Sequence, residues 1–261
     1  MNRADAPRTW SYDALADVYA TDMGQSMPFD DVAWYRSVCL QHGGAVLELG
    51  CGTGRILLEL LAAGIDAIGA DRSLPMLHRL RRDAGMRNLQ PQVVQMDLRA
   101  IALNAKFGVI LAPYSLITYL VDPDTAMQVL RRLRRLLMPG GVLVVDAFVP
   151  QPVVSFGDFR LDYRRAHGAL TLERHKRIRA NADGSNRIER RYRLCSADGR
   201  HVEEFLTDET IRPYTARQLT ELCHAAGLAA SAWSFDYAAR AAMEGAWFAT
   251  GIFHAADRTA A

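Results

Sequence analysis

Short apolar runs alternate with amphipathic stretches over residues 45–150. This alternation predicts parallel strands joined by crossover helices, and therefore a doubly wound α/β sheet. We expect strands at residues 45–49, 67–70, 92–96, 107–111 and 142–145. A helix burying Ile56, Leu57, Leu60 and Leu61 should follow the first strand, and a second should cover about 123–137. Because ligands bind beyond the carboxyl ends of such strands, the residues after the strands should face one pocket.

The hydrophobic period changes after residue 150. Residues 151–213 read as short, polar, alternating strands, with Asp183-Gly184 and Asp198-Gly199 as hairpin turn signals. Thr215 suits the N-cap of a helix to about His224, with Gly227 as its stop, and two last strands near 228–236 and 247–254 should rejoin the main sheet. We therefore expect an N-terminal helical cover (1–44), a core (45–150), an antiparallel β insertion acting as a lid (151–213), and a C-terminal helix and strands completing the core sheet (214–261).

Composition narrows the class of protein. The chain has 261 residues, half of them hydrophobic, and a net charge of +2, which creates no strong field for polyanions. We expect neither nucleic acid nor a membrane as partner, since no stretch approaches the ~20 apolar residues of a span and the N-terminus lacks a secretion signal. Four separated cysteines without metal-ligand spacing predict free thiols, no metal and a cytoplasmic location.

A glycine-rich loop stands between the first strand and its helix. Its sequence, ELGCGTGR, has glycines at positions 50, 52 and 54, where the backbone can turn sharply and approach a ligand. Nucleotide, flavin and nicotinamide sites use similar turns. Arg55 occupies the position of the third glycine in a dinucleotide fingerprint, which disfavours nicotinamide. Asp71 follows the first glycine by about 20 residues, the spacing at which a carboxylate can bind ribose hydroxyls.

The motif series ELGCGTGR, the acid in IGADRS, the acid in VVQMDLRAI and the segment LMPGGVLVVDAF resemble those of class I S-adenosylmethionine-dependent methyltransferases. The resemblance covers about residues 45–150 well and RPYTARQLTELCHAAGL more loosely. It implies an enzyme that uses S-adenosyl-L-methionine, with a Rossmann-like seven-stranded sheet whose last strand is antiparallel.

The resemblance also implies roles for individual residues. Gly50, Gly52 and Gly54 would bound the methionine moiety, Asp71 the ribose and Asp97 the adenine amino group. Other implied contacts are the Leu98 amide and Met76 at the adenine, and Pro113 to Ser115 beside the sulfonium. Glu48 would reach the methionine amino group through a water, or serve only structure before a helix N-terminus. The remaining predicted cofactor contacts are Tyr19, Cys51, Arg55 and Arg72. Cys51 could also suggest a nucleophile, but no histidine lies near it in sequence.

The N-terminal stretch WSYDALADVY resembles a YDxLAxxY segment that folds across the cofactor pocket in small-molecule members of this family. Tyr12 and Tyr19 would then contact cofactor or substrate. Alternatively, Tyr12, Leu15 and Tyr19 merely form the apolar stripe of a covering helix. Trp34 could join either arrangement.

In sugar-amine and amino-acid N-methyltransferases of similar layout, a small antiparallel sheet roofs the acceptor. Methyl transfer from a sulfonium is a direct displacement, which requires alignment and exclusion of water. An amine must arrive unprotonated, whereas a hydroxyl would need a nearby base. The candidate catalytic residues are Tyr12, Tyr114 and His167, and the candidate substrate contacts are Trp34, Tyr119, Glu173, Arg190 and Arg212.

These patterns favour a methyltransferase acting on a nitrogen, or an oxygen, of a small molecule, with secondary metabolism as the suggested setting. A second hypothesis is an enzyme of the same fold that cyclises the methionine chain and releases methylthioadenosine, because fold alone does not determine reaction. A third is a non-catalytic subunit, which the intact loop and both acids disfavour. The sequence leaves open whether the chain is a monomer or a homodimer.

Overall fold

The core of the chain is a seven-stranded sheet with the order β10-β11-β5-β4-β1-β2-β3. The computed structural model describes residues 11–23, 27–150 and 153–256. Strand β11 runs antiparallel to both neighbours, which confirms the predicted seven-stranded sheet with its last strand antiparallel. The strands are β1 (Val46–Leu49), β2 (Ala67–Asp71), β3 (Gln92–Gln95), β4 (Phe107–Ala112), β5 (Leu137–Phe148), β10 (Leu228–Phe235) and β11 (Phe248–Ala255).

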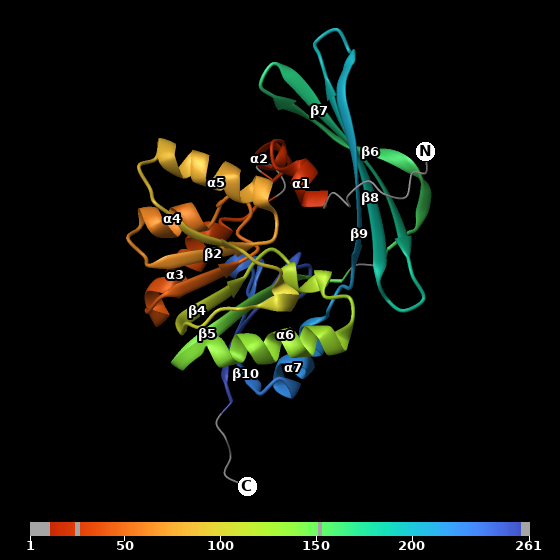
Figure 1. Ribbon diagram of the computed structural model, residues 1–261. Helices are drawn as coiled ribbons and strands as arrows, with labels where there is room; N and C mark the ends of the chain where they lie inside the picture. Colours follow the sequence, from red (N-terminus) through yellow and green to blue (C-terminus); the bar gives the residue numbers. More distant parts are fainter. Residues whose placement is uncertain (1–10, 24–26, 151–152, 257–261) are drawn as a thin grey trace, which may run out of the picture.

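Helices cover both faces of this sheet, as Figure 1 shows. Because strand side chains alternate between faces, Leu47 and Ile110 pack toward α6 and α7, whereas Val46 and Val109 pack toward α3, α4 and α5. The longer helices are α3 (Asp31–His42), α4 (Leu57–Ala62), α5 (Leu74–Met86), α6 (Pro123–Leu136) and α7 (Ala216–Ala225). Short helices are α1 (Ser11–Leu15), α2 (Tyr19–Met23), η1 (Leu98–Ala100), η2 (Leu116–Tyr119) and η3 (Asp236–Ala238).

The helix boundaries largely follow the predicted signals. Thr215 caps α7 through a capping box with Gln218, and Gly227 has the positive φ of 81° that a helix stop favours. The predicted apolar face of the first core helix needs one correction. Leu58 is buried at 5% exposure, while Leu61 is only partly buried, because α4 turns Leu58 toward the glycine loop.

A second sheet, which we call the lid sheet, contains four antiparallel strands beside the core. Its strands are β6 (Phe156–His167), β7 (Leu170–Ala180), β8 (Asn186–Cys195) and β9 (His201–Ile211). The hairpin turns predicted at Asp183-Gly184 and Asp198-Gly199 are confirmed. The expectation of short strands was wrong, since each has ten to twelve residues. Cross-strand ion pairs such as Arg187–Asp208 and Arg193–Glu204 stabilise these long polar strands, which we expected to be shorter from the sequence.

The N-terminal helices lie between the lid sheet and α5 (Figure 1). Leu15 and Val18 pack with Leu172 of the lid sheet and Met76 of α5. The buried Asp22 accepts a hydrogen bond from Arg174 at 2.7 Å and another from the Tyr163 hydroxyl. Breaking a buried ion pair leaves an uncompensated charge, so this contact attaches the lid sheet firmly to α2.

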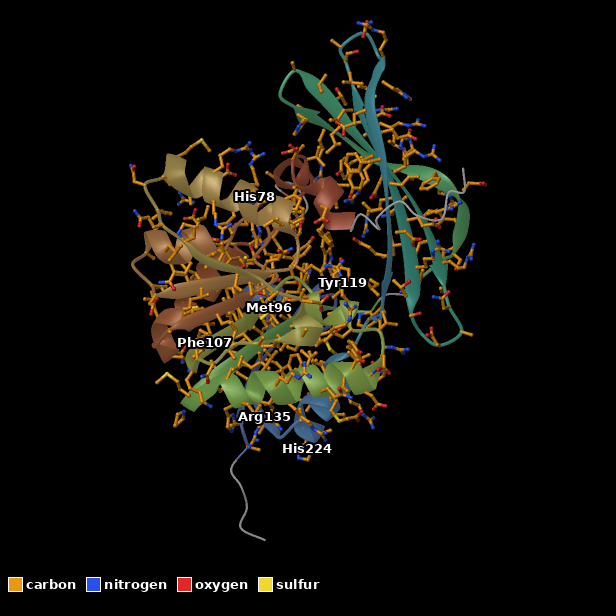
Figure 2. The ribbon with its side chains drawn as sticks, viewed as in Figure 1. His78, Met96, Phe107, Tyr119, Arg135 and His224 are labelled. Carbon is orange, nitrogen blue, oxygen red and sulfur yellow. The ribbon has the colours of Figure 1, made fainter. Side chains whose placement is uncertain are left out.

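The carboxyl ends of the core strands face the lid sheet. In Figure 2, Tyr119, which follows β4, lies on the side toward the lid sheet, whereas Phe107, at the start of β4, lies toward the opposite end. None of the helices within the described ranges is long and apolar enough to span a membrane.

Candidate functional site

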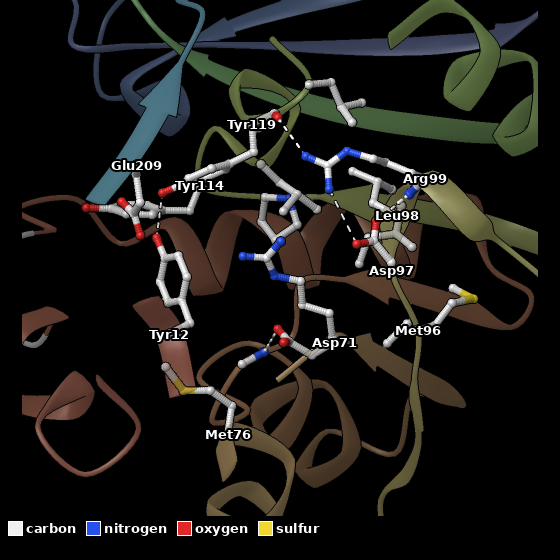
Figure 3. A pocket seen from close by; sticks show the side chains of 18 of the residues that line it. Tyr12, Asp71, Met76, Met96, Asp97, Leu98, Arg99, Tyr114, Tyr119 and Glu209 are labelled. Atoms are coloured by element: carbon white, nitrogen blue, oxygen red, sulfur yellow. Dashed lines mark hydrogen bonds and ion pairs between the residues drawn. The ribbon is translucent and has the colours of Figure 1, made fainter. Parts of the chain in front are cut away.

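A cavity of about 700 Å³ lies between the carboxyl ends of the core strands and the lid sheet. This volume falls in the range of roughly 300–1,000 Å³ that holds small-molecule ligands. Predicted residues in its wall, several of them visible in Figure 3, are Tyr12, Tyr19, Gly50, Gly52, Asp71, Arg72, Met76, Asp97, Leu98, Pro113, Tyr114 and Tyr119. The crevice expected from the strand order therefore exists, and both carboxylates of the motif series line it.

The glycine loop bends because its three glycines have φ angles of 64°, 53° and 87°. Side chains other than glycine rarely adopt such values. Gly50 and Gly52 line the cavity. Gly54 has another role: a Cβ there would lie 2.8 Å from Leu80 Cγ, so this glycine permits close packing against α5. This packing explains the need for glycine at position 54, and its predicted contact with a cofactor stays a prediction.

Two acids hold the loops of the cavity in place. Asp71 accepts hydrogen bonds from the amides of Gly52, at 2.9 Å, and Ser73, at 2.8 Å. Burial raises the pKa of this carboxyl, and the two amide bonds partly offset the increase. Asp97 caps η1 by accepting from the Arg99 amide at 2.8 Å. Each carboxylate oxygen offers further lone pairs, so both acids can also accept from a ligand.

Cys51 and Arg55 serve the fold in this structure. Cys51 is 4% exposed, and burial raises the pKa of its thiol, which argues against the nucleophile hypothesis. Arg55 forms a two-pronged ion pair with Asp31 of α3, with N to O distances of 2.7 and 2.6 Å. Neither is among the described residues that line the cavity. Cys51 is thus buried in the core, and Arg55 attaches α3 to the glycine loop. Neither side chain lies where we predicted it to contact a cofactor.

Glu48 lies behind the glycine loop with 2% of its surface exposed. Its Oε2 is buried without a hydrogen-bond partner. Burial raises the pKa of the Glu48 carboxyl to about 8. Below about pH 8 the side chain is therefore mostly protonated and neutral.

We expect Glu48 to make stability fall as pH rises. The folded chain keeps this proton up to about pH 8, whereas the unfolded chain releases it near the ordinary value of 4.5. Between those values unfolding releases a proton, so the free energy of unfolding decreases by up to about 1.4 kcal/mol per pH unit. Glu48→Gln is neutral throughout and should lack this component. Urea unfolding of both proteins across this pH window checks the difference, and parallel profiles would contradict it.

The wall formed by Pro113, Tyr114 and Ser115 is held in a strained conformation. Tyr114 and Ser115 have φ angles of 50° and 57°, which cost free energy in residues other than glycine. The buried Asp146 accepts from the Ser115 amide and from the Tyr35 hydroxyl, the latter at 2.6 Å. The Tyr237 hydroxyl is a third donor to it. Asp146 thus fixes the wall from behind.

At the lid side, four residues meet: Tyr12, Tyr119, Arg190 and Glu209. We call them the roof cluster. The Tyr12 and Tyr119 hydroxyls share a hydrogen bond of 2.5 Å, and Arg190 donates to Glu209 at 2.7 Å. Burial raises the pKa of both tyrosines, and the charge of Glu209 adds to the increase. Both hydroxyls therefore stay protonated and can act only as neutral hydrogen-bond partners.

Other predicted acceptor residues point elsewhere, and these predictions are corrected. His167 bonds Thr21 through Nδ1 at 2.8 Å, and Trp34 packs on Tyr35 and Tyr237. Glu173 pairs with Arg164, on the face of the lid sheet opposite the buried Leu172. Arg212 donates to the carbonyls of Val121 and Asp183. Within the described ranges, none of these four side chains lines the cavity.

Sequence reasoning missed several wall residues. Arg99 and Met96 flank the predicted Asp97, and proximity to that acid could have indicated them. The wall residues on β9 carried no such signal, because nothing in the sequence indicates which end of a lid strand reaches the core. The wall residues not predicted are Leu49, Ala70, Met96, Arg99, Leu116, Leu120, Val121, Arg187, Asp208, Glu209 and Thr210.

The sequence of this chain is similar to the sequences of known methyltransferases. Residues 46–141 match a family model described as a methyltransferase domain. The chain is 30% identical over 119 residues to the cypemycin N-terminal methyltransferase of a Streptomyces species, which covers 46% of this chain and 48% of that protein. The chain spans about half the length of the curated relatives it matches.

Two solved structures share the fold over almost the whole chain. The CcbJ methyltransferase of Streptomyces caelestis superimposes with a TM-score of 0.80 at 23% identity, covering 95% of this chain and 98% of that one. The sugar N-methyltransferase KedS8 of Streptoalloteichus superimposes with a TM-score of 0.71 at 22% identity, covering 97% and 99%. The lid sheet is included in these superpositions, since coverage at this level extends past the core.

Proposed function

We propose that this chain, whose residues 46–141 match a family model described as a methyltransferase domain, is an S-adenosylmethionine-dependent enzyme that transfers a methyl group to a nitrogen of a small molecule. The observation that carries the proposal is the cavity that joins the glycine loop, Asp71 and Asp97 to the lid sheet. A cofactor on the core side of this cavity would leave the side toward the lid sheet for the acceptor.

The residues present fit S-adenosyl-L-methionine. Asp71 would accept from the ribose hydroxyls and Asp97 from the adenine amino group, with Leu98 and Met76 beside the ring. Gly50 and Gly52 would lie against the methionine moiety. The unpartnered Oε2 of Glu48 behind this loop is an acceptor that the moiety's amino group could satisfy through a water. When bound, S-adenosyl-L-methionine supplies an electrophilic methyl group on a positively charged sulfur.

The protein's own contribution is alignment and exclusion of water. Tyr19 and Tyr114 line the cavity, and Asp146 holds the Ser115 amide next to Tyr114. The cavity wall would hold a neutral amine with its lone pair directed toward the methyl group of the bound cofactor and would keep water away from both. Exact positioning of the two reactants can supply much of the acceleration of such a displacement.

A nitrogen acceptor suits the ionisable groups of the cavity. Burial raises the pKa of Tyr12, Tyr114 and Tyr119, so these tyrosines stay protonated and cannot take a proton from an acceptor. No histidine within residues 11–23, 27–150 and 153–256 lines the cavity. An amine that arrives neutral needs no strong base, whereas a hydroxyl would. The similarity to the cypemycin N-terminal methyltransferase and to the sugar N-methyltransferase KedS8 supports this proposal.

The test is a product analysis by mass spectrometry. The purified protein is incubated with S-adenosyl-L-methionine alone, and then with panels of small amines and of the matching alcohols. We expect an intact cofactor alone, and S-adenosylhomocysteine with a methylated amine when the amine panel is present. Methylthioadenosine released from the cofactor alone would replace methyl transfer by cyclisation of the methionine chain. Methylated alcohols without methylated amines would move the proposal from nitrogen to oxygen.

A further inference from the structure

Glu209 is a cavity residue with one oxygen lacking a partner. It stands near the end of β9 with 9% of its surface exposed. Oε2 accepts from Arg190 at 2.7 Å, while Oε1 is buried and makes no hydrogen bond. Leaving a charged oxygen buried and unpaired costs free energy. A donor that reaches Oε1 would recover this free energy.

The surroundings of Oε1 indicate where such a donor would come from. In Figure 3 the Glu209 side chain lies beside the hydroxyl ends of Tyr12 and Tyr119, and its charge acts on both. These hydroxyls are occupied with each other, at 2.5 Å, so one of their two protons is already used. All three side chains line the same cavity. A ligand group that enters between them can donate to Oε1 and accept the remaining hydroxyl proton.

The charge balance of the roof cluster selects among donors. Arg190 already compensates Glu209, and the neighbouring Arg187 compensates Asp208. A neutral group that both donates and accepts therefore fits better than a permanent cation or a carboxylate. A neutral amine has this property, through its N–H bonds and its lone pair.

We propose that Glu209 recognises the acceptor by accepting a hydrogen bond from its amino group at Oε1, with the Tyr12–Tyr119 pair as the second contact. This inference rests on the proposed methyltransferase function and extends it to the substrate class: a small, uncharged molecule that carries a primary or secondary amine. As methylation proceeds, positive charge develops on that nitrogen. Glu209 then interacts more strongly with the transition state than with the substrate, which favours the reaction.

The test measures amine binding in the presence of saturating S-adenosylhomocysteine. The probes are glucosamine, aniline and glycinamide, measured at a pH above the pKa of each amino group so that the amine is neutral, and each is compared with its hydroxyl counterpart: glucose, phenol or glycolamide. Saturation-transfer NMR reports binding to the wild type, Glu209→Gln and Glu209→Ala. The control is Glu204→Gln, on the same strand, whose side chain pairs with Arg193 on the outer face of the lid sheet. If loss of Glu209 prevents folding, the double variant Glu209→Gln with Arg190→Gln leaves no unpaired charge.

We expect at least one amine to bind more tightly than its hydroxyl counterpart, and Glu209→Ala to weaken it about tenfold or more, as loss of a hydrogen bond to a charged group does. Glu204→Gln should behave as the wild type. Equal amine binding with and without Glu209 would overturn the proposal. So would S-adenosylhomocysteine binding without binding of any amine, although methyl transfer would then stand. Failure of S-adenosylhomocysteine itself to bind would remove the proposed function and this inference together.

Discussion

Asp71→Ala is expected to weaken S-adenosylhomocysteine binding about a hundredfold, which corresponds to about 2.8 kcal/mol. The substitution would remove the charged hydrogen bonds from both ribose hydroxyls to the carboxylate. It would also leave the amides of Gly52 and Ser73, which donate to Asp71 at 2.9 and 2.8 Å, without the acceptor that shapes the glycine loop. Asp71→Asn retains one acceptor oxygen and should lose less. Titration calorimetry on the three proteins measures the order.

Asp66→Ala provides the matched control for this experiment. Asp66 is an exposed acid immediately before β2, and Asp71 ends the same strand. The two substitutions remove the same side chain from opposite ends of one element. We expect the dissociation constant of Asp66→Ala to equal that of the wild type. A dissociation constant for Asp71→Ala that is also unchanged would show that the ligand binds away from this edge of the sheet.

The core of the fold could be read from sequence because its signals are local. Each buried strand is a short apolar run, and each acid of the motif series follows directly after one, as Asp71 and Asp97 do. Parallel order then places their side chains at one edge without further information. The glycines at 50 and 52 were placed correctly at the cavity for the same reason, since a strand-to-helix turn determines where they lie.

The acceptor side could not be predicted because it depends on how two sheets meet. Lid strands of ten to twelve residues present many charged side chains, and only the register determines which of them reach the core. Glu173 and His167 were chosen for their chemistry, but their strands direct them to Arg164 and Thr21. Glu209 was missed because several acids lie near it in sequence, and nothing in the sequence distinguishes it from them. The partner of Arg55 was likewise missed, since Asp31 lies on a helix that no motif indicated.

Asp146→Ala is expected to lower the free energy of unfolding by about 3 kcal/mol or more, because three buried donors would lose their acceptor at about 1–3 kcal/mol each. The side chain is fully buried on β5 and joins three parts of the chain: Tyr35 of α3, Tyr237 near β11 and the Ser115 amide. Chemical unfolding measures the loss. Asp124→Ala, an exposed position on α6, is the control and should unfold as the wild type does.

The same substitution should also lower activity, and a less severe variant can separate this effect from unfolding. Tyr35→Phe removes one donor while leaving the Ser115 amide paired, so it should cost only about 1 kcal/mol and keep the cavity wall in place. Asp146→Ala, by contrast, leaves the Ser115 amide without its acceptor. If Tyr114 and Ser115 keep their positive φ angles only because Asp146 holds them, Asp146→Ala at a temperature where it is folded should reduce turnover far more than Tyr35→Phe. Equal turnover in these two variants would mean that the wall is held by its own packing, and that Asp146 contributes stability alone.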